Sequence, residues 1–246
     1  MPEPDAPRLV SLVPSVTETL LAWGVRPVAC TRFCEQPDVP HVGGTKDPDV
    51  AAIVALGPDM VVMCVEENRI EDADALADAG VATAALTIES LDDVDVALRV
   101  LAGLAGSGAT VPAQRDLAAL AAARAGIERP PPDAVRAFVP IWKRPWMSLA
   151  GSTYGSSLLA ALGIENVYAD APDRYPEVTL QDAAARQPDI VLAPSEPYPF
   201  AARHIPLLEE VAPVVLVDGQ DLFWWGTRTP TALGRLAAVL GREKRT

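Results

Sequence analysis

Apolar and polar residues follow a strand-then-helix order along the first 90 residues of the chain. Residues 8–13, RLVSLV, form a short, mostly apolar run of the kind that lies inside a parallel sheet. Pro14 ends this run, and the helix that follows reaches Trp23 and closes at Gly24. Further strands are expected at 28–30, 60–64 and 81–86, and helices at 50–56 and 70–79. Strands that alternate with helices in this way predict an α/β lobe with a parallel sheet.

Helical periodicity replaces this alternation in the middle of the chain. Apolar residues recur at helical spacing from Leu91 onward, which predicts a helix over 91–104. A second helical run covers 111–127 and ends before a run of prolines. We expect no strand between Leu86 and Val135, so a long helical connector joins two sheets.

The alternation returns in the last part of the chain. Strands are expected at 137–142, 166–168, 190–193 and 214–217, and helices at 154–162, 180–186, 205–211 and 231–240. Three regions follow: an N-terminal α/β lobe at 1–90, a helical connector with the bridging helix at 91–130, and a C-terminal α/β lobe at 131–246. The predicted fold is α/β, with two Rossmann-like lobes that have parallel sheets, a long inter-lobe helix and a ligand cleft between the lobes.

A weak internal repeat relates the two predicted lobes. Residues 57–59, Gly-Pro-Asp, and residues 187–189, Gln-Pro-Asp, each lead from a helix into an apolar strand. A glutamate follows the proline at the same offset in both, Glu66 in the first lobe and Glu196 in the second. Each glutamate is expected just past the carboxyl end of a strand, where open α/β sheets meet ligands and partners.

Aromatic residues are concentrated in predicted loops and at the ends of elements. The chain has 5 Trp, 4 Tyr and 4 Phe, of which we assign Trp23, Phe138 and Tyr168 to the core. The others are Phe33, Trp142, Trp146, Tyr154, Tyr175, Tyr198, Phe200, Phe223, Trp224 and Trp225. Such rings either line a ligand site or fold back over small satellite cores. Nearly all of them belong to the second lobe, which is therefore expected to provide most of the ligand surface.

Cationic residues stand beside several of these rings. Aromatic walls with a few charged anchors suit a large, flat or partly anionic ligand. We predict that the ligand contacts come from Phe33, Lys46, Trp142, Arg144, Trp146, Tyr154, Arg174, Tyr175, Tyr198, Phe223, Trp224 and Trp225.

Charge and composition narrow the partners and the location. The net charge of -13 repels nucleic acid and anionic membranes. No apolar run reaches the ~18 residues of a membrane span. The first residues lack the basic and apolar regions of a signal peptide. We therefore expect a cytoplasmic monomer, or an extracytoplasmic one if a leader precedes these residues in the native protein.

Catalytic patterns are weak in this sequence. His41 and His204 lack neighbours at metal-ligand spacing, and His204 is only a weak metal candidate. The three cysteines, Cys30, Cys34 and Cys64, are read as ordinary thiols because an odd number argues against a disulfide framework. We predict a binding protein that is not an enzyme and has no intrinsic cofactor.

Several motifs together resemble a known family, the helical-backbone (class III) substrate-binding proteins of ABC importers. They are RLVSLVPSVTE at 8–18, VGGT at 42–45, the Pro-Asp strand entry at 58–59, and GIENVYAD at 163–170. This family includes vitamin B12-binding proteins and iron-siderophore receptors. The segments at 66–68, 141–147, 174–178 and 195–200 resemble a subgroup without leaders.

The resemblance implies two lobes bridged by one long helix, with a hinge that opens little. It also implies that one glutamate on each lobe docks on arginines of the importer's membrane subunit, and Glu66 or Glu67, and Glu196, match in position. The implied ligand is a corrinoid or another metal chelate. Two alternatives remain: a cytosolic carrier of a metallated cofactor, and a chelatase-like enzyme that would use His204, Cys34 or Glu177.

Overall fold

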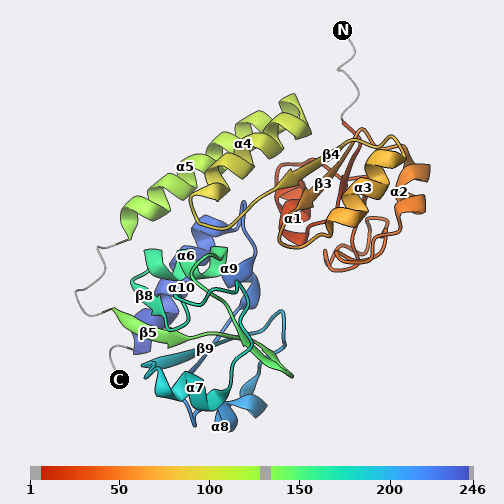
Figure 1. Cartoon of the computed structure of the whole chain (residues 1–246). Coiled ribbons are helices and arrows are strands. Elements are labelled where there is room, and N and C mark those ends of the chain that lie inside the picture. Colours follow the sequence, from red (N-terminus) through yellow and green to blue (C-terminus); the bar gives the residue numbers. More distant parts are fainter. Residues whose placement is uncertain (1–6, 128–133, 244–246) are drawn as a thin grey trace. The chain divides into compact units, whose positions relative to one another are not determined.

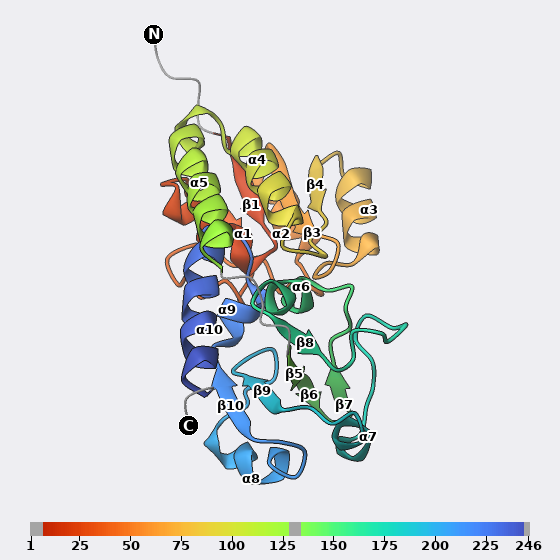
Figure 2. The same ribbon diagram turned by 90° about the vertical axis from the view of Figure 1, so that its left-hand side faces the viewer.

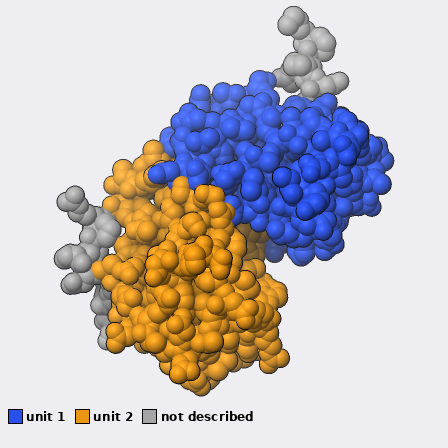
Figure 3. All heavy atoms as spheres, in the orientation of Figure 1, with its two compact units in different colours: residues 1–88, 92–119, 225–227 blue, residues 89–91, 120–224, 228–246 orange. Residues whose placement is uncertain are grey.

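The computed structural model describes residues 7–127 and 134–243. The chain folds into two compact units, coloured separately in Figure 3. Unit 1 comprises residues 1–88, 92–119 and 225–227, and unit 2 comprises residues 89–91, 120–224 and 228–246. The predicted three-region division differs from these units in its treatment of the connector, most of which belongs to unit 1.

Unit 1 is built on a parallel sheet of four strands in the order β2-β1-β3-β4. The strands are β1 (Leu9–Ser11), β2 (Ala29–Cys30), β3 (Met60–Cys64) and β4 (Thr83–Leu86). The helices between them are α1 (Pro14–Ala22), α2 (Val50–Leu56) and α3 (Ile70–Asp78). Ile53 of α2 and Leu76 of α3 pack with Val10 and Val61 of the sheet in one core cluster. α2 and α3 therefore cover the same face of the sheet, as Figure 1 shows.

Two further helices of the chain follow β4 (Figure 2). They are α4 (Asp93–Ala105) and, after a 3₁₀ turn at Ser107–Ala109, α5 (Thr110–Gly126). The first part of α5, up to residue 119, belongs to unit 1 and the remainder to unit 2. The Trp23 indole at the end of α1 donates to Asp116 of α5 at 2.8 Å, which fixes this first part onto unit 1. α5 is therefore the long helix that the sequence predicts between the lobes.

Unit 2 is built on a second parallel sheet, in the order β10-β9-β5-β8. Its strands are β5 (Val135–Phe138), β8 (Ile164–Asn166), β9 (Ile190–Pro194) and β10 (Val214–Val217). The helices are α6 (Tyr154–Ala161), α7 (Leu180–Ala185), α8 (Ile205–Leu208), α9 (Gly219–Phe223) and α10 (Thr229–Glu243). Ala183 of α7 and Leu208 of α8 pack on Phe138 and Val191 of the sheet, so these helices share a face.

A two-stranded antiparallel hairpin stands outside this sheet. It consists of β6 (Pro140–Lys143) and β7 (Trp146–Ser148). The sequence predicts a single strand over 137–142, and this prediction is wrong: Val139 separates β5 from β6, and β6 pairs with β7 rather than with the sheet. Pro140 lacks the backbone N–H that a central strand must donate, which favours the break at this point. The helix α9 was also not predicted.

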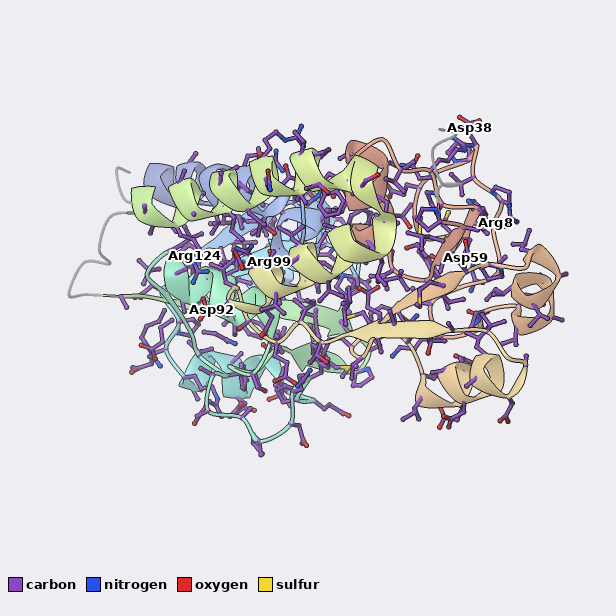
Figure 4. All side chains as sticks on the ribbon, turned by 90° about the horizontal axis from the view of Figure 1, so that it is seen from above. Arg8, Asp38, Asp59, Asp92, Arg99 and Arg124 are labelled. Carbon is purple, nitrogen blue, oxygen red and sulfur yellow. The ribbon has the colours of Figure 1, made fainter. Side chains whose placement is uncertain are left out.

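The same clamp holds the first strand of each sheet. In unit 1 the Asp59 carboxylate accepts the Arg8 N–H at 2.7 Å, and Arg8 donates to the carbonyls of Leu56 and Gly57 at the end of α2. Figure 4 labels Arg8 and Asp59 next to each other. Asp189 and Arg136 repeat these bonds in unit 2, where the carboxylate is also 2.7 Å from the Arg136 N–H.

The clamp in unit 2 extends to the helix that precedes Asp189. The Arg136 guanidinium donates to the carbonyl oxygens of Arg186 at 2.6 Å and Gln187 at 3.0 Å. Gly57 and Gln187 both adopt a positive φ, 55° and 52°, where helix carbonyls turn toward the arginine. The internal repeat seen in the sequence is therefore a repeat of structure.

A short segment late in the chain returns to unit 1. Residues 225–227 belong to unit 1 although they lie between α9 and α10 of unit 2. The Thr227 N–H donates to the Thr19 hydroxyl of α1 at 3.2 Å. A Cβ at Gly226, where φ is 111°, would lie 2.2 Å from that hydroxyl, so only glycine fits here. Besides the crossing within α5, the chain therefore also passes between the units at 88/89, 91/92, 224/225 and 227/228.

Three further points concern the prolines after the connector, the strand-free stretch between the sheets, and membrane-spanning helices. The prolines expected to end the connector, at 130–132, lie outside the described residues. Between Leu86 and Val135, the residues that the structure describes contain no strand, as predicted. A search of the described helices finds none with the length and apolar character needed to cross a bilayer.

Candidate ligand site and docking loops

Five rings form a continuous cluster in unit 2. The Trp142 and Tyr198 rings meet edge to face with centroids 5.6 Å apart, and Tyr198 lies 4.7 Å from Phe200. Phe200 is stacked on Trp146 at 6.0 Å with an interplanar angle of 6°. The His204 ring meets both Tyr198 and Phe200 at 5.5 Å. Trp142, Trp146, Tyr198, Phe200 and His204 are called the aromatic cluster below.

The aromatic cluster joins the hairpin to the loop after β9. Its base is the Phe200 ring, which is 4% exposed and belongs to the core of unit 2, and Trp146 and Tyr198 pack against that core. Its rim is Trp142, which is 42% exposed. Rings that are anchored at one end and exposed at the other form a wall that a planar ligand can stack on.

Backbone hydrogen bonds hold the hairpin in place beneath this wall. The Ser148 N–H donates to Pro176 O at 3.0 Å, and the Val178 N–H donates to Trp146 O at 2.9 Å. The Ser148 hydroxyl donates to Val139 O at 2.9 Å. Two segments on either side of the hairpin therefore fix β7, and with it the direction of Trp146.

His204 is a structural member of the aromatic cluster. It is 5% exposed, and its Nδ1 accepts the Ala201 N–H at 3.1 Å. Burial lowers the pKa of His204, and the charges of Arg203 and Lys143 lower it further, so the ring is neutral at pH 7. With Nδ1 accepting, the single ring proton lies on Nε2. Neither nitrogen then offers a lone pair to a metal, which counts against the weak metal candidate.

Three predicted cations differ in their availability. Arg144 is exposed in the turn between β6 and β7, one residue beyond the strand that carries Trp142. Arg174 forms an ion pair with Glu89. Lys46 belongs to unit 1, where its ammonium donates to Glu66 O at 3.3 Å. Only Arg144 therefore accompanies the aromatic cluster as an exposed cation from the predicted set.

Two predicted ligand residues are buried instead. Tyr154 is 6% exposed in α6, and its hydroxyl lies 3.1 Å from that of Thr229. Burial raises the pKa of the Tyr154 phenol, as expected for a core side chain. Trp225 is 2% exposed in the segment that returns to unit 1. Both lie at element ends, where the sequence pattern does not distinguish a core ring from a ligand contact.

The other predicted rings lie apart from the aromatic cluster or beside other groups. Phe33 is 49% exposed in unit 1, with the Arg32 guanidinium 4.8 Å from its centroid. Tyr175 is 42% exposed in the segment before Pro176 and Val178, whose backbone is hydrogen-bonded to β7. Trp224 is half-buried, and the Arg228 guanidinium lies 5.2 Å from its ring centroid. Phe223 lies close to Gly155, since a Cβ added to that glycine would be 3.3 Å from the Phe223 ring.

A buried asparagine holds the loop of Glu66 and Glu67 in unit 1. The Asn68 amide donates to Leu12 O at 3.2 Å and Thr45 O at 2.9 Å, and its oxygen accepts the Cys64 N–H at 2.7 Å. Asn68 thus ties together the loops that follow β1, β2 and β3. The sequence gives no signal for this role of Asn68, because a lone asparagine in a loop has no periodicity.

A glycine determines the position of Glu196 in unit 2. The Gly219 N–H at the start of α9 donates to the Ser195 hydroxyl at 2.9 Å. A Cβ on Gly219 would lie 2.5 Å from both the Glu196 nitrogen and its Cγ. Glu66 and Glu196 each stand two residues beyond their strand, β3 ending at Cys64 and β9 at Pro194. The two glutamates therefore occupy equivalent places in their units.

The chain matches a known protein family. Residues 9–205 match the family model described as periplasmic binding protein. The chain belongs to this family. Among curated relatives, the vitamin B12-binding protein of Pectobacterium carotovorum subsp. carotovorum is 23% identical over 227 residues, covering 88% of this chain and 81% of the relative. The vitamin B12-binding protein of Salmonella typhimurium is 28% identical over 199 residues, covering 76% and 72%.

Solved structures of periplasmic binding proteins share the fold. The periplasmic vitamin B12 binding protein BtuF of Vibrio cholerae superposes with a TM-score of 0.81 at 19% identity, covering 98% of this chain and 99% of that one. The periplasmic heme-binding protein BhuT in complex with two hemes gives a TM-score of 0.79 at 22% identity, covering 95% and 97%. The predicted family and the two-lobed α/β fold are confirmed.

The candidate catalytic residues belong to different units. Cys34 is buried in unit 1, whereas Glu177 and His204 belong to unit 2. Among the described residues, no group of three or more His, Cys, Asp or Glu side chains could hold a metal ion.

Proposed function

We propose that this protein binds a corrinoid or another large, flat metal chelate on the aromatic cluster of unit 2. The observation that carries the proposal is the graded exposure of that cluster, from Phe200 in the core to Trp142 at the rim. A flat ligand gains most from such a wall, because it exchanges water for ring faces on one side. Arg144 supplies a cation beside the rim for an anionic substituent. The vitamin B12 and heme names of the relatives support the same ligand class.

Fluorescence titration tests this proposal. The chain has 5 Trp, and two of them, Trp142 and Trp146, belong to the aromatic cluster. Cobalamin, cobinamide, hemin and a ferric siderophore are added separately to the protein, and quenching is corrected with free tryptophan. Saturable quenching by one of them supports the proposal. Silence across all four contradicts it.

We also propose that Glu66 or Glu67 in unit 1 and Glu196 in unit 2 dock the loaded protein on arginines of an ABC permease. Their equivalent places two residues past β3 and β9 support this role, since one partner with repeated halves can then use the same contact twice. The double variant Glu66→Ala/Glu196→Ala should keep its ligand affinity and lose uptake in cells that carry the permease. The double variant Glu71→Ala/Glu209→Ala, which removes the same number of charges elsewhere, should keep both its ligand affinity and its uptake. Equal loss of uptake in both would contradict specific docking.

We also propose where the protein acts, in which oligomeric state it acts, and that it does not catalyse a reaction. A permease-coupled binding protein works on the extracytoplasmic side, so the native gene product should fractionate there. We propose that it acts as a monomer that does not transform its ligand. Support comes from the engagement of His204 Nδ1, which accepts the Ala201 N–H. Sedimentation and mass spectrometry of the released ligand test these points.

A further inference from the structure

Two of the three cysteines lie in contact in unit 1. Cys30 ends β2, and Cys34 closes the turn that follows, with its N–H donating to Thr31 O at 3.1 Å. The two side chains belong to one cluster of buried residues together with Val39. Both are reduced and buried, Cys30 at 0% and Cys34 at 2% exposure.

Two hydroxyl groups from different elements surround the Cys34 sulfur. The Thr31 hydroxyl accepts the Phe33 N–H at 3.3 Å and lies 3.2 Å from Cys34 Sγ. Either group can be the donor while Cys34 is a thiol, and once Cys34 is a thiolate the Thr31 hydroxyl can donate to it. The Thr17 hydroxyl of α1 also lies 3.2 Å from Cys34 Sγ. A sulfur that receives hydrogen bonds is stabilised as a thiolate.

The electrostatics of the pair follow from these contacts. The hydrogen bond from Cys30 and those from Thr17 and Thr31 lower the pKa of Cys34 to about 6, against the opposing effect of burial. The same contact and burial raise the pKa of Cys30. Cys34 is thus suited to act as the attacking thiolate, and Cys30 as the thiol that then forms the disulfide with it.

Cys64 provides an internal contrast. It is 1% exposed, and burial raises its pKa to about 12, with the nearby carboxylate of Glu67 acting in the same direction. Burial alone therefore does not distinguish the three thiols; the neighbours of each one do. The turn of Cys34 also reaches the surface, since Phe33 beside it is 49% exposed.

We propose that Cys30 and Cys34 form a redox pair that closes a disulfide in the presence of hydrogen peroxide. The Cys34 thiolate attacks one peroxide oxygen, the O–O bond breaks, and hydroxide leaves, so that Cys34 becomes a sulfenic acid. Cys30 sulfur then attacks the Cys34 sulfur, and the S–O bond breaks with loss of water as the Cys30 proton is released. The pair loses two electrons and the peroxide is reduced to two waters. This site is independent of the ligand and docking proposals.

Intact-mass spectrometry tests the redox pair. The full-length protein is reduced, freed of reductant, exposed to hydrogen peroxide, quenched, unfolded and alkylated. Wild type and Cys64→Ser should each lose the mass of two hydrogen atoms and two alkylation sites, with peptide mapping joining Cys30 to Cys34. Cys30→Ser should instead carry a sulfenic acid on Cys34 that dimedone traps. Cys34→Ser should keep its remaining thiols reduced.

A second variant series covers the case in which Cys34→Ser does not fold. Thr31→Val removes the hydroxyl beside Cys34 and should slow disulfide formation several-fold, whereas Thr31→Ser should restore the wild-type rate. Circular dichroism confirms that both are folded. The proposal is overturned if peroxide leaves all three wild-type thiols alkylatable, or if Cys64 is oxidised as fast as Cys34.

Discussion

The two units share one scaffold and differ at the edges of their sheets. Each has a four-stranded parallel sheet, an Arg-Asp clamp at the first strand and a glutamate two residues past an equivalent strand. At the carboxyl edge of unit 1, Asn68 donates hydrogen bonds to backbone carbonyls of two other loops. At the corresponding strand of unit 2, the loop after β9 carries Tyr198 and Phe200.

This difference separates what builds a unit from what it recognises. Both units have the clamp and the buried strands. The edge loops are not constrained in this way, so one unit can stiffen its edge with hydrogen bonds while the other exposes rings. We therefore expect changes at the shared features to affect stability alike in both units, and changes at the edges to affect them differently.

The largest expected loss of stability follows from replacing the two asparagines of the chain, one in each unit. Asn68 makes three hydrogen bonds, and so does Asn166, to Leu149 O, Ser156 Oγ and the Tyr168 N–H. Alanine at either position leaves buried backbone groups unpaired, at ~1–3 kcal/mol for each group, so we expect a loss of about 3 kcal/mol in the free energy of unfolding. Urea denaturation of both variants measures this.

A matched exposed polar change provides the control for the asparagine variants. Gln114→Ala in α5 removes an amide of similar size at an exposed position, and its effect should be within about 0.5 kcal/mol of zero. If Asn68→Ala and Asn166→Ala also stayed near zero, hydrogen bonds from these amides would not hold the edge loops.

The next effect distinguishes the units by function. Trp142→Ala removes the exposed rim of the aromatic cluster, so ligand binding should weaken about tenfold or more, equivalent to ~1.4 kcal/mol, with less than ~1 kcal/mol lost in stability. Leu216→Ala is the matched control, because Leu216 lies in unit 2 and is 41% exposed against 42% for Trp142. Phe33→Ala, in unit 1, should weaken binding less than Trp142→Ala. A larger effect at Phe33 would place the main ligand surface in the other unit.

The sequence predicts the scaffold of the two units better than it predicts their edge loops. Short apolar runs bounded by glycine and proline predicted both parallel sheets, because a strand buried on two faces has a composition that few other segments share. The Pro-Asp repeat predicted equivalent places for Glu66 and Glu196 before the clamp was visible. The clamp itself was not predicted, because Asp59 and Asp189 bind arginines 51 and 53 residues away along the chain.

The edges could be predicted only in part. Tyr154 and Trp225 were expected to line a ligand site and are buried, because position along the chain does not fix the side to which a ring turns. The hairpin β6–β7 was missed because residues 137–142 are uniformly apolar up to Trp142. Asn68 and Gly219 act through contacts with residues far along the chain, and a pattern that covers neighbouring residues does not contain them.

A smaller effect tests the shared scaffold. Asp59→Ala and Asp189→Ala each remove one carboxylate that accepts a backbone N–H at 2.7 Å. Each should lower the free energy of unfolding by about 1–2 kcal/mol, as other capping carboxylates do. The comparison predicts similar values for the two variants. A difference of more than ~1 kcal/mol between them, measured in the same denaturant series, would show that the clamp has different importance in the two units.

The smallest expected effect is the pH response of the aromatic cluster. Burial lowers the pKa of His204 in the folded protein below its ordinary value of 6.5, so between these two values the unfolded chain binds more protons than the folded one. The contribution of neutral His204 is therefore complete above the unfolded pKa and falls as the pH drops through 6.5 toward the folded pKa. His204→Asn keeps an acceptor for the Ala201 N–H and does not titrate, so its stability should fall less than that of wild type between pH 7.5 and pH 5. Tyr198→Phe keeps the ring contact and should retain the wild-type response. If the His204→Asn and wild-type stability curves were parallel over this range, His204 would titrate alike in both states and would not link the aromatic edge of unit 2 to pH.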